Sequence, residues 1–205
     1  MQTRPDARAR RFYMAALEPP GNIARDIALF RRRLFAAAGD PSALAFPEIV
    51  PLAIGGIPTE RPIRLKGRNR EHLLDPAWEG VTGPFRLGQI LSAEGGLYLR
   101  TEGPVGQLAA ATRRLMDGAG FEPYPLPPLR CALGVFLGRA SDDILSDALR
   151  LSPPEISFGD AQLVFLRFDS GSDPFAALAW KELGRSRRLR GKPERAGRKG
   201  RSEGA

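Results

Sequence analysis

Histidine and cysteine are nearly missing from this chain of 205 residues, which holds one of each. A single cysteine excludes a disulfide within the chain, and one cysteine with one histidine cannot form a zinc site from protein ligands alone. Long apolar runs are also missing, which excludes a membrane-spanning helix of ~20 residues, and the basic start of the chain lacks the apolar segment of a secretory signal. We therefore expect no metal and no other cofactor, no membrane partner, and a cytoplasmic location.

The positive charge is concentrated at the end of the chain. Of the net charge of +8, the residues from Lys181 onward carry +7, because they hold ten lysines and arginines against three glutamates. The same segment is rich in Gly, Ser and Arg and has no apolar periodicity, which is typical of disorder. We predict a basic N-terminal segment at 1–10, one folded domain at 11–183 and a disordered basic tail at 184–205.

Apolar periodicity predicts that strands and helices alternate within the folded domain. Segments with apolar side chains every three or four residues are predicted helices, and short apolar or alternating runs between turn residues are predicted strands. The predicted strands are 11–17, 49–57, 63–66, 85–91, 97–101 and 129–137, with one or two more in 156–168, and the predicted helices are 23–38, 104–116, 142–149 and 173–183.

The order of these elements predicts an α+β or α/β fold in which sheet and helices form separate layers. A weak sequence echo connects the two halves of the chain, because Pro51-Leu52-Ala53-Ile54 is matched by Ala132-Leu133-Gly134-Val135. Each of these segments follows a predicted helix. A duplicated β-α-β unit would produce such an echo.

Four segments, taken in this order, carry a resemblance to a known family. They are RFYMAALEPP (11–20), FPEIVPLAIGGIP (46–58), GLYLRTEGPVGQLAAATRRLMDGAGF with PPLRCALGVFLGR (96–121 and 127–139) and ISFGDAQLVFLRFDSGSDPFAALAWKEL (156–183). With these segments the chain resembles the 2H phosphoesterases, which include the bacterial 2′-5′ RNA ligase-like proteins and the RNA 2′,3′-cyclic phosphodiesterases. The resemblance implies an α+β fold with two pseudo-symmetric lobes of mostly antiparallel sheet and outer helices around a central groove.

The chemistry of that family rests on two His-x-Thr/Ser motifs, one in each lobe, in which one histidine acts as general base and the other as general acid. Here the first motif falls on Ile49-Val50-Pro51-Leu52, with Ile and Pro in the two polar positions. The second falls on Arg130-Cys131-Ala132-Leu133, or one residue earlier with Leu129 and Cys131 in those positions. Because no register supplies a histidine, the resemblance implies a member that has lost the hydrolytic mechanism.

Basic residues near the two motifs are the candidate phosphate-binding set. If Arg130 faces the groove, its guanidinium can hold a phosphate through two parallel hydrogen bonds, and if it faces outward it is a surface residue. Arg64, Lys66 and Arg68 alternate on a predicted strand close to the first motif. Such a row can follow an RNA backbone, or it can protect an edge strand from aggregation.

Two further residues with reactive side chains are not assigned to catalysis. His72 follows the first motif by about twenty residues and lies in a polar stretch that is typical of a solvated surface. Cys131 lies in an apolar strand, where a thiol packs as a small hydrophobic group and has no histidine to activate it. No catalytic residue is therefore predicted.

Three functions remain open from the sequence. The first is a degenerate 2H-like protein that binds RNA ends or a phosphorylated small molecule. The second is an active phosphodiesterase with a displaced catalytic set that uses Arg130, His72 or acidic residues. The third is an interaction module whose basic tail recruits an anionic partner, with nonspecific nucleic-acid contact through that tail. A groove lined by Ile49, Pro51 and Ala132 without converging charges would favour the third.

Overall fold

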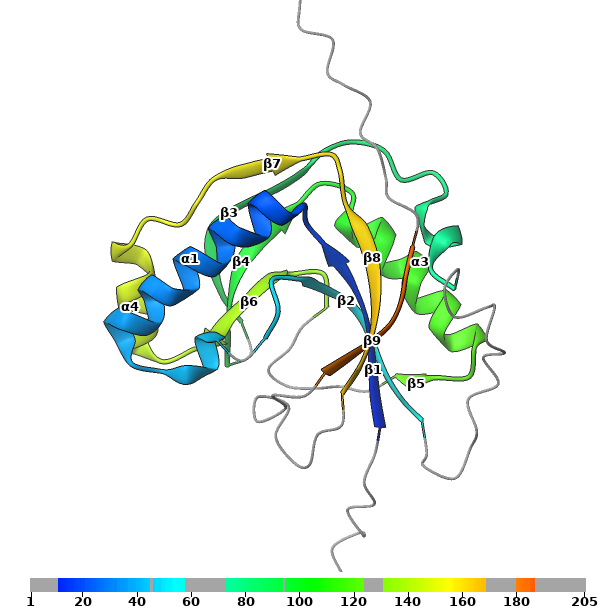
Figure 1. Cartoon of the computed structure of the whole chain (residues 1–205), viewed down its shortest axis with the longest axis horizontal. Helices are drawn as coiled ribbons and strands as arrows, with labels where there is room; N and C mark the ends of the chain where they lie inside the picture. Colours follow the sequence, from blue (N-terminus) through cyan, green and yellow to red (C-terminus); the bar gives the residue numbers. More distant parts are fainter. Residues whose placement is uncertain are drawn as a thin grey trace, which may run out of the picture.

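The computed structural model describes residues 11–44, 46–57, 73–93, 95–123, 131–168 and 180–186 (Figure 1). Within these ranges the strands are β1 (Arg11–Glu18), β2 (Val50–Ile57), β3 (Phe85–Ala93), β4 (Gly96–Glu102), β5 (Glu122–Pro123), β6 (Gly134–Arg139), β7 (Ile156–Phe158), β8 (Gln162–Phe168) and β9 (Trp180–Arg185). The helices are α1 (Gly21–Ala38), α3 (Val105–Gly118) and α4 (Asp142–Arg150), with the short 3-10 helices η1 (Pro41–Leu44) and η2 (Asp75–Trp78).

The strands form two sheets, which we name lobe A and lobe B. Lobe A has the order β5-β2-β1-β8-β9 and lobe B the order β6-β4-β3-β7. All the described strand pairs are antiparallel. In lobe A the chain runs from β1 through α1 to the neighbouring strand β2, and in lobe B it runs from β4 through α3 to the neighbouring strand β6. The predicted α+β fold with two sheet lobes is therefore confirmed.

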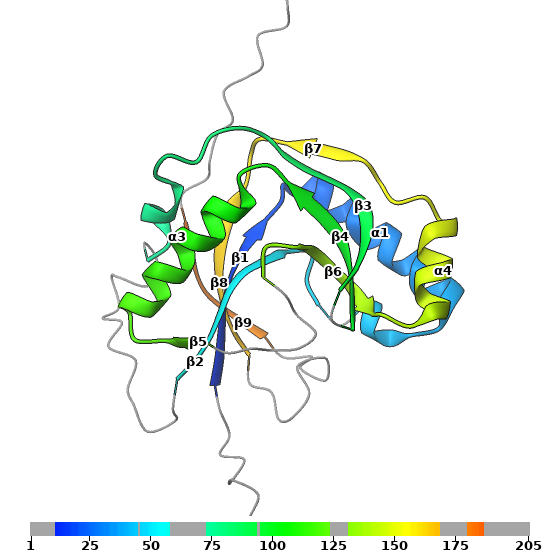
Figure 2. The ribbon, with the colours of Figure 1, turned by 180° about the vertical axis from the view of Figure 1, so that it is seen from behind.

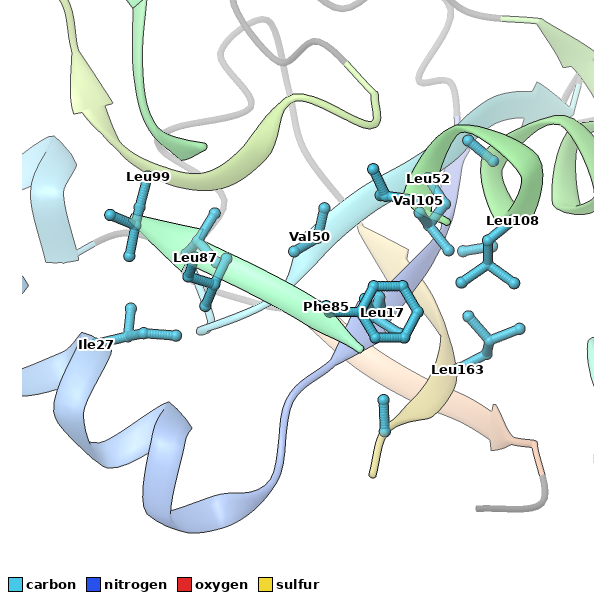
Figure 3. Packing of buried hydrophobic residues seen from close by; sticks show 14 of the residues in the cluster. Leu17, Ile27, Val50, Leu52, Phe85, Leu87, Leu99, Val105, Leu108 and Leu163 are labelled. Carbon is cyan, nitrogen blue, oxygen red and sulfur yellow. The ribbon is translucent and has the colours of Figure 1, made fainter. Parts of the chain in front are cut away.

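Each long helix packs against the sheet of the opposite lobe. In Figure 3, Ile27 of α1 points toward Leu87 and Leu99 of lobe B, while Leu108 of α3 lies beside Leu163 of lobe A. Figures 1 and 2 agree with this, because α1 and α4 lie beside β3, β4 and β6, whereas α3 lies beside β2 and β8. The helices thereby join the two lobes through one continuous main core.

Local sequence explains where the helices begin and end. Both α1 and α3 follow a proline, Pro20 and Pro104, whose restricted backbone suits the start of a helix and whose missing N–H is not needed there. α1 ends at Gly39 with φ of 71°, a left-handed conformation that glycine adopts without strain. Ser141 caps α4, because its hydroxyl oxygen accepts a hydrogen bond from the backbone N–H of Ile144 at 3.3 Å.

The last described element differs from the sequence prediction. A helix was predicted over 173–183, but residues 180–185 form strand β9, which pairs with β8. Ser186 then fixes the end of β9, because its backbone N–H donates to the carbonyl of Leu163 at 2.8 Å and its hydroxyl oxygen accepts from the backbone N–H of Leu163 at 2.9 Å. The apolar spacing of Phe175, Leu178 and Leu183 indicated a helix, but Phe175 and Leu178 lie outside the described residues. Leu183 lies in β9, at the irregularity in the pairing of that strand with β8.

Two other segments were predicted to contain strands. One or two strands were predicted in 156–168, and this segment forms two, β7 and β8, which belong to different sheets. The predicted strand 63–66 lies outside the described residues. Among the described helices, none is long and apolar enough to cross a bilayer.

Candidate functional site

The two segments that align with the family motifs lie side by side at the junction of the lobes. The backbone N–H of Ala132 donates a hydrogen bond to the carbonyl oxygen of Pro51 at 2.7 Å. Pro51 stands at the second polar position predicted for the first motif, and Ala132 stands at that of the second motif in one of its two predicted registers. β2 and β6 are also in contact, so the two chain segments approach each other from opposite sheets.

The second motif is a turn and not part of a strand. A strand was predicted over 129–137, but β6 begins only at Gly134. Ala132 has φ of 64°, which no extended strand contains, and this conformation turns its N–H toward Pro51. The carbonyl of Leu133 then accepts from the backbone N–H of Thr101 at 2.9 Å, which begins the pairing of β6 with β4.

Register places the first motif on one face of the lobe A sheet. Pro51 lies opposite Ala16, and Ile54 lies opposite Met14, with an irregularity in β1 between Ala15 and Ala16. Residues opposite each other in a sheet point to the same face. This face, which we name the inner face, is the one turned away from α3 and the main core.

A second hydrophobic cluster, the inner cluster, joins this face to one face of the lobe B sheet. We name that second face, which carries Tyr98 and Phe136, the inner face of lobe B. Three aromatic rings pack together in it. The centroid of the Phe136 ring lies 5.4 Å from that of Phe46, which follows η1 in the chain, and 5.6 Å from that of Tyr98. None of its described members carries a formal charge, so the junction of the two lobes is packed with uncharged side chains. The buried members are Phe12, Met14, Ala16, Phe46, Ile49, Ile54, Tyr98, Phe136, Val164 and Leu166, with Ala93, Cys131 and Leu133 packed against them.

A buried arginine of α1 holds the segment that leads into the first motif. Arg31 is 1% exposed, and its guanidinium donates to the carbonyl of Phe46 and to Glu48 Oε1, the latter at 3.1 Å. Burial lowers the pKa of Arg31, and the neighbouring Glu48 carboxylate opposes that shift. Two of its nitrogens, Nε and one terminal nitrogen, have no hydrogen-bond partner among the residues that the structure describes. Sequence reasoning missed this residue, although its position four residues after Ile27 is on the apolar face of the helix.

Cys131 is a poor nucleophile in this setting. Burial raises the pKa of its thiol to about 11, while Arg113 and a hydrogen bond with the backbone of Ile54 act in the opposite direction. Since the thiolate is the reactive form, the side chain is protonated and unreactive near neutral pH. Its half-buried position against the inner cluster agrees with the expected packing role.

The basic residues proposed from the sequence lie outside the described residues. This holds for Arg64, Lys66, Arg68 and Arg130, and equally for His72. The structure therefore brings together the two motif segments but does not describe the candidate phosphate-binding side chains. In the described ranges, no three His, Cys, Asp or Glu side chains are grouped so that they could hold a metal ion.

Two polar pockets on the sheets were missed by the sequence reasoning. The lobe B pocket, about 420 Å³, is lined by side chains that include Arg86, Arg100 and Glu155. The lobe A pocket, about 240 Å³, is lined by Glu18 and Arg185 together with the Pro19-Pro20 turn. The alternation of Tyr98, Arg100 and Glu102 along β4 was a usable signal, because alternate residues share a face.

No protein-family model matches the chain, and a search of curated proteins finds no significant match. The function must therefore be argued from the fold and from these sites.

Proposed function

We propose that this chain is a two-lobed protein of the 2H phosphoesterase type that has lost hydrolytic activity and binds an RNA end or a phosphorylated small molecule in the cytoplasm. The resemblance is supported by the common strand order of the two lobes, β2-β1-β8-β9 and β6-β4-β3-β7. It is also supported by the hydrogen bond between Ala132 and Pro51, since a 2H protein is expected to bring its two motif segments together at the lobe junction.

The observation that carries the loss of activity is the apolar character of the inner cluster. Ile49 is 4% exposed and packs within that cluster, and Pro51 is buried opposite Ala16. Ile49 stands at the histidine position of the first motif and cannot take up or release a proton, and no register of the second motif supplies a histidine. General acid–base catalysis typically contributes ~10²–10⁴-fold to a rate, so a site without both histidines loses most of the family mechanism.

The proposed ligand contacts are the basic residues around the motif segments. Arg130 directly precedes Cys131, which packs against the inner cluster, and Arg64, Lys66 and Arg68 follow β2 in the chain. A guanidinium can bind a phosphate with two hydrogen bonds and needs no proton transfer to do so. Binding can therefore persist where catalysis is lost.

The test uses the full chain and a short fluorescent RNA that ends in a 2′,3′-cyclic phosphate. We expect no opening of the cyclic phosphate on a denaturing gel, and saturable binding of the same RNA by fluorescence anisotropy. Arg130→Ala should weaken binding roughly tenfold, as expected for the loss of a charge-assisted contact. The matched control is Arg25→Ala, which removes an exposed arginine of α1 far in sequence from both motifs.

Two outcomes would overturn the proposal. Turnover that disappears in Arg130→Ala would show an active phosphodiesterase with a displaced catalytic set. Binding that is unchanged in Arg130→Ala but lost when Arg187, Arg188 and Arg190 are all replaced by alanine would show recruitment through the basic tail. The apolar inner cluster is the observation that favours this second candidate, an interaction module.

A further inference from the structure

The lobe B pocket gathers charges of both signs on one sheet face. Its volume of about 420 Å³ is at the lower end of the range for small-molecule sites. The polar side chains that line it are Arg86 and Gln89 from β3, Arg100 and Glu102 from β4, and Ser157 of β7 with Glu155 just before that strand.

Strand register brings these side chains to the inner face of lobe B. Arg86 lies opposite Glu102 on one side and opposite Ser157 on the other. Along β4, Arg100 and Glu102 alternate with Tyr98, which belongs to the inner cluster. The pocket is therefore on the same sheet face as the inner cluster, at the other end of the strands.

An irregularity in β3 opens the floor of the pocket. Leu87 pairs with Thr101 and Ile90 with Leu99, so the two residues Gly88 and Gln89 face the single residue Arg100. Such a bulge changes the direction of neighbouring side chains and is frequent beside binding sites. Gly88 has no side chain to fill the space, and an added Cβ would meet only Glu155 Cγ at 3.9 Å.

Two side chains of opposite charge at this pocket, Arg86 and Glu155, have no ion-pair partner among the described residues. Arg100, the other arginine of the pocket, makes only weak contacts: its Nε lies 3.6 Å from Glu102 Oε1, and a terminal nitrogen lies 3.5 Å from Gln89 Oε1. Arg86 and Glu155 form no ion pair within the described part of the chain, although both border the same cavity. Glu155 borders the space at Gly88 from the chain before β7, and Arg86 lines the same pocket from β3.

In the lobe A pocket, at the corresponding corner of its sheet, the charged side chains bind one another. There Arg185 donates to Glu18 and to both oxygens of Glu182, at 2.6 and 2.9 Å for the latter. Gln162 accepts a further hydrogen bond from the same guanidinium at 3.3 Å. The charges of lobe A are thus used within the protein, while those of lobe B are open to a ligand.

We propose that the lobe B pocket binds a small zwitterion of the α-amino-acid class. The ligand's carboxylate lies between the guanidiniums of Arg86 and Arg100, and its ammonium group lies beside the carboxylate of Glu155. A zwitterion fits because the two arginines and two glutamates of the pocket sum to zero charge, so a ligand of one sign would be repelled by half of them. This site is independent of the proposed function, which depends on Arg130 and the motif segments.

The test is a ligand-observed NMR titration of the full chain with L-leucine and two analogues of the same shape. 4-Methylpentanoate lacks the ammonium group and 3-methylbutylamine lacks the carboxylate. We expect L-leucine to bind about tenfold or more tightly than either analogue, because each analogue leaves one charge of the pocket unpaired. Glycine and L-glutamine complete the panel, because the charges of the pocket indicate a zwitterion but do not indicate which amino-acid side chain it carries.

Variants connect the binding to this pocket. Arg86→Ala should weaken L-leucine binding about tenfold. Glu155→Gln should weaken L-leucine binding but not the binding of 4-methylpentanoate, which the Glu155 carboxylate repels. Gly88→Leu fills the cavity while it keeps all four charges, and Arg25→Ala is the control. Circular dichroism checks that each variant is folded. If Gly88→Leu does not fold, Arg86→Ala and Glu155→Gln decide the result, because both replace exposed side chains.

The proposal is overturned if no member of the panel binds saturably, if L-leucine and 4-methylpentanoate bind equally, or if Arg86→Ala leaves binding unchanged. No saturable RNA binding by the unmodified chain together with L-leucine binding that depends on Arg86 would leave this site standing without the proposed function. RNA binding that depends on Arg130 together with no L-leucine binding would leave only the proposed function.

Discussion

Lobe A and lobe B share an order of four antiparallel strands and differ in how they use the charged side chains at one corner of each sheet. The corner of lobe A is the pocket with Arg185, and the corner of lobe B is the pocket with Arg86. In both lobes a strand ends in a glutamate, Glu18 or Glu102. A proline stands two residues later, and a helix begins directly after that proline. In lobe A the nearby Arg185 is bound by two carboxylates, and these hydrogen bonds raise its pKa further above its ordinary value. In lobe B no such network forms around Arg86 within the part of the chain that the structure describes. Two sheets with a common order of four strands can thus have one structural corner and one corner that is available to a ligand.

The comparison also separates the corners from the junction between the lobes. At the junction, side chains of both sheets merge in the inner cluster, whose described members carry no formal charge. At the lobe B corner the same sheet face is polar and open. We therefore expect a ligand at the polar edges of the sheets and not within the inner cluster.

The largest expected effect is the loss of the packing that joins the lobes. Phe136 is 1% exposed and contacts the rings of both Phe46 and Tyr98. Phe136→Ala should lower the free energy of unfolding by about 3–5 kcal/mol, measured by urea denaturation. Phe35→Ala, at an exposed position of α1, is the matched control and should cost much less. Two separate unfolding transitions in the unmodified chain would contradict the view that the inner cluster makes one cooperative unit of the lobes.

A smaller effect is expected at Cys131, which packs at the same junction. Because its pKa rises from 9.0 to about 11 on folding, the folded state keeps its proton at a pH where the unfolded state loses it. Stability should therefore fall as the pH rises from 9 to 11, by roughly 2–3 kcal/mol in total. Cys131→Ala should lack this fall.

Alkylation gives a second measurement at the same residue. At pH 8 the native thiol should react with iodoacetamide about one hundred times more slowly than the thiol of the urea-unfolded chain, as two units of pKa imply. Equal rates in the native and unfolded chains would mean that the junction is open to solvent.

The smallest effect sharpens the contrast between the two corners. Arg185→Ala removes the contacts to Glu18 and Glu182 and should cost about 0.5–1 kcal/mol, a modest value because the side chain is partly exposed. Arg86→Ala removes no ion pair among the described residues and should leave stability unchanged. Thermal unfolding of both variants side by side measures this difference. A larger loss in Arg86→Ala than in Arg185→Ala would reverse the assignment of the two corners.

Much of the framework could be predicted from the sequence because local patterns determine it. The inward spacing of Ile23, Ile27 and Leu34 predicted α1, and Gly39 marked its end. The two segments at β7 and β8 were also expected as strands, but no local pattern says that they join different sheets. Pairing between segments far apart in the chain decides such questions.

The site was harder to predict than the fold. The positive φ of Ala132 and the resulting contact with Pro51 depend on tertiary packing, so the apolar run at 129–137 was interpreted as one strand. The pocket around Arg86 depends on a register irregularity in β3 and on a third strand, β7. Neither feature is visible in the charges of a single segment.

The most direct test of the difference between the corners is protein-observed NMR of the full chain during titration with L-leucine. We expect backbone amide shifts to change at Gln89, Arg100 and Ser157 around the lobe B pocket, while those of Glu18 and Arg185 in lobe A stay constant. Changes centred on Arg185, or equal changes at both corners, would contradict the account. They would show that the two lobes use their charges in the same way.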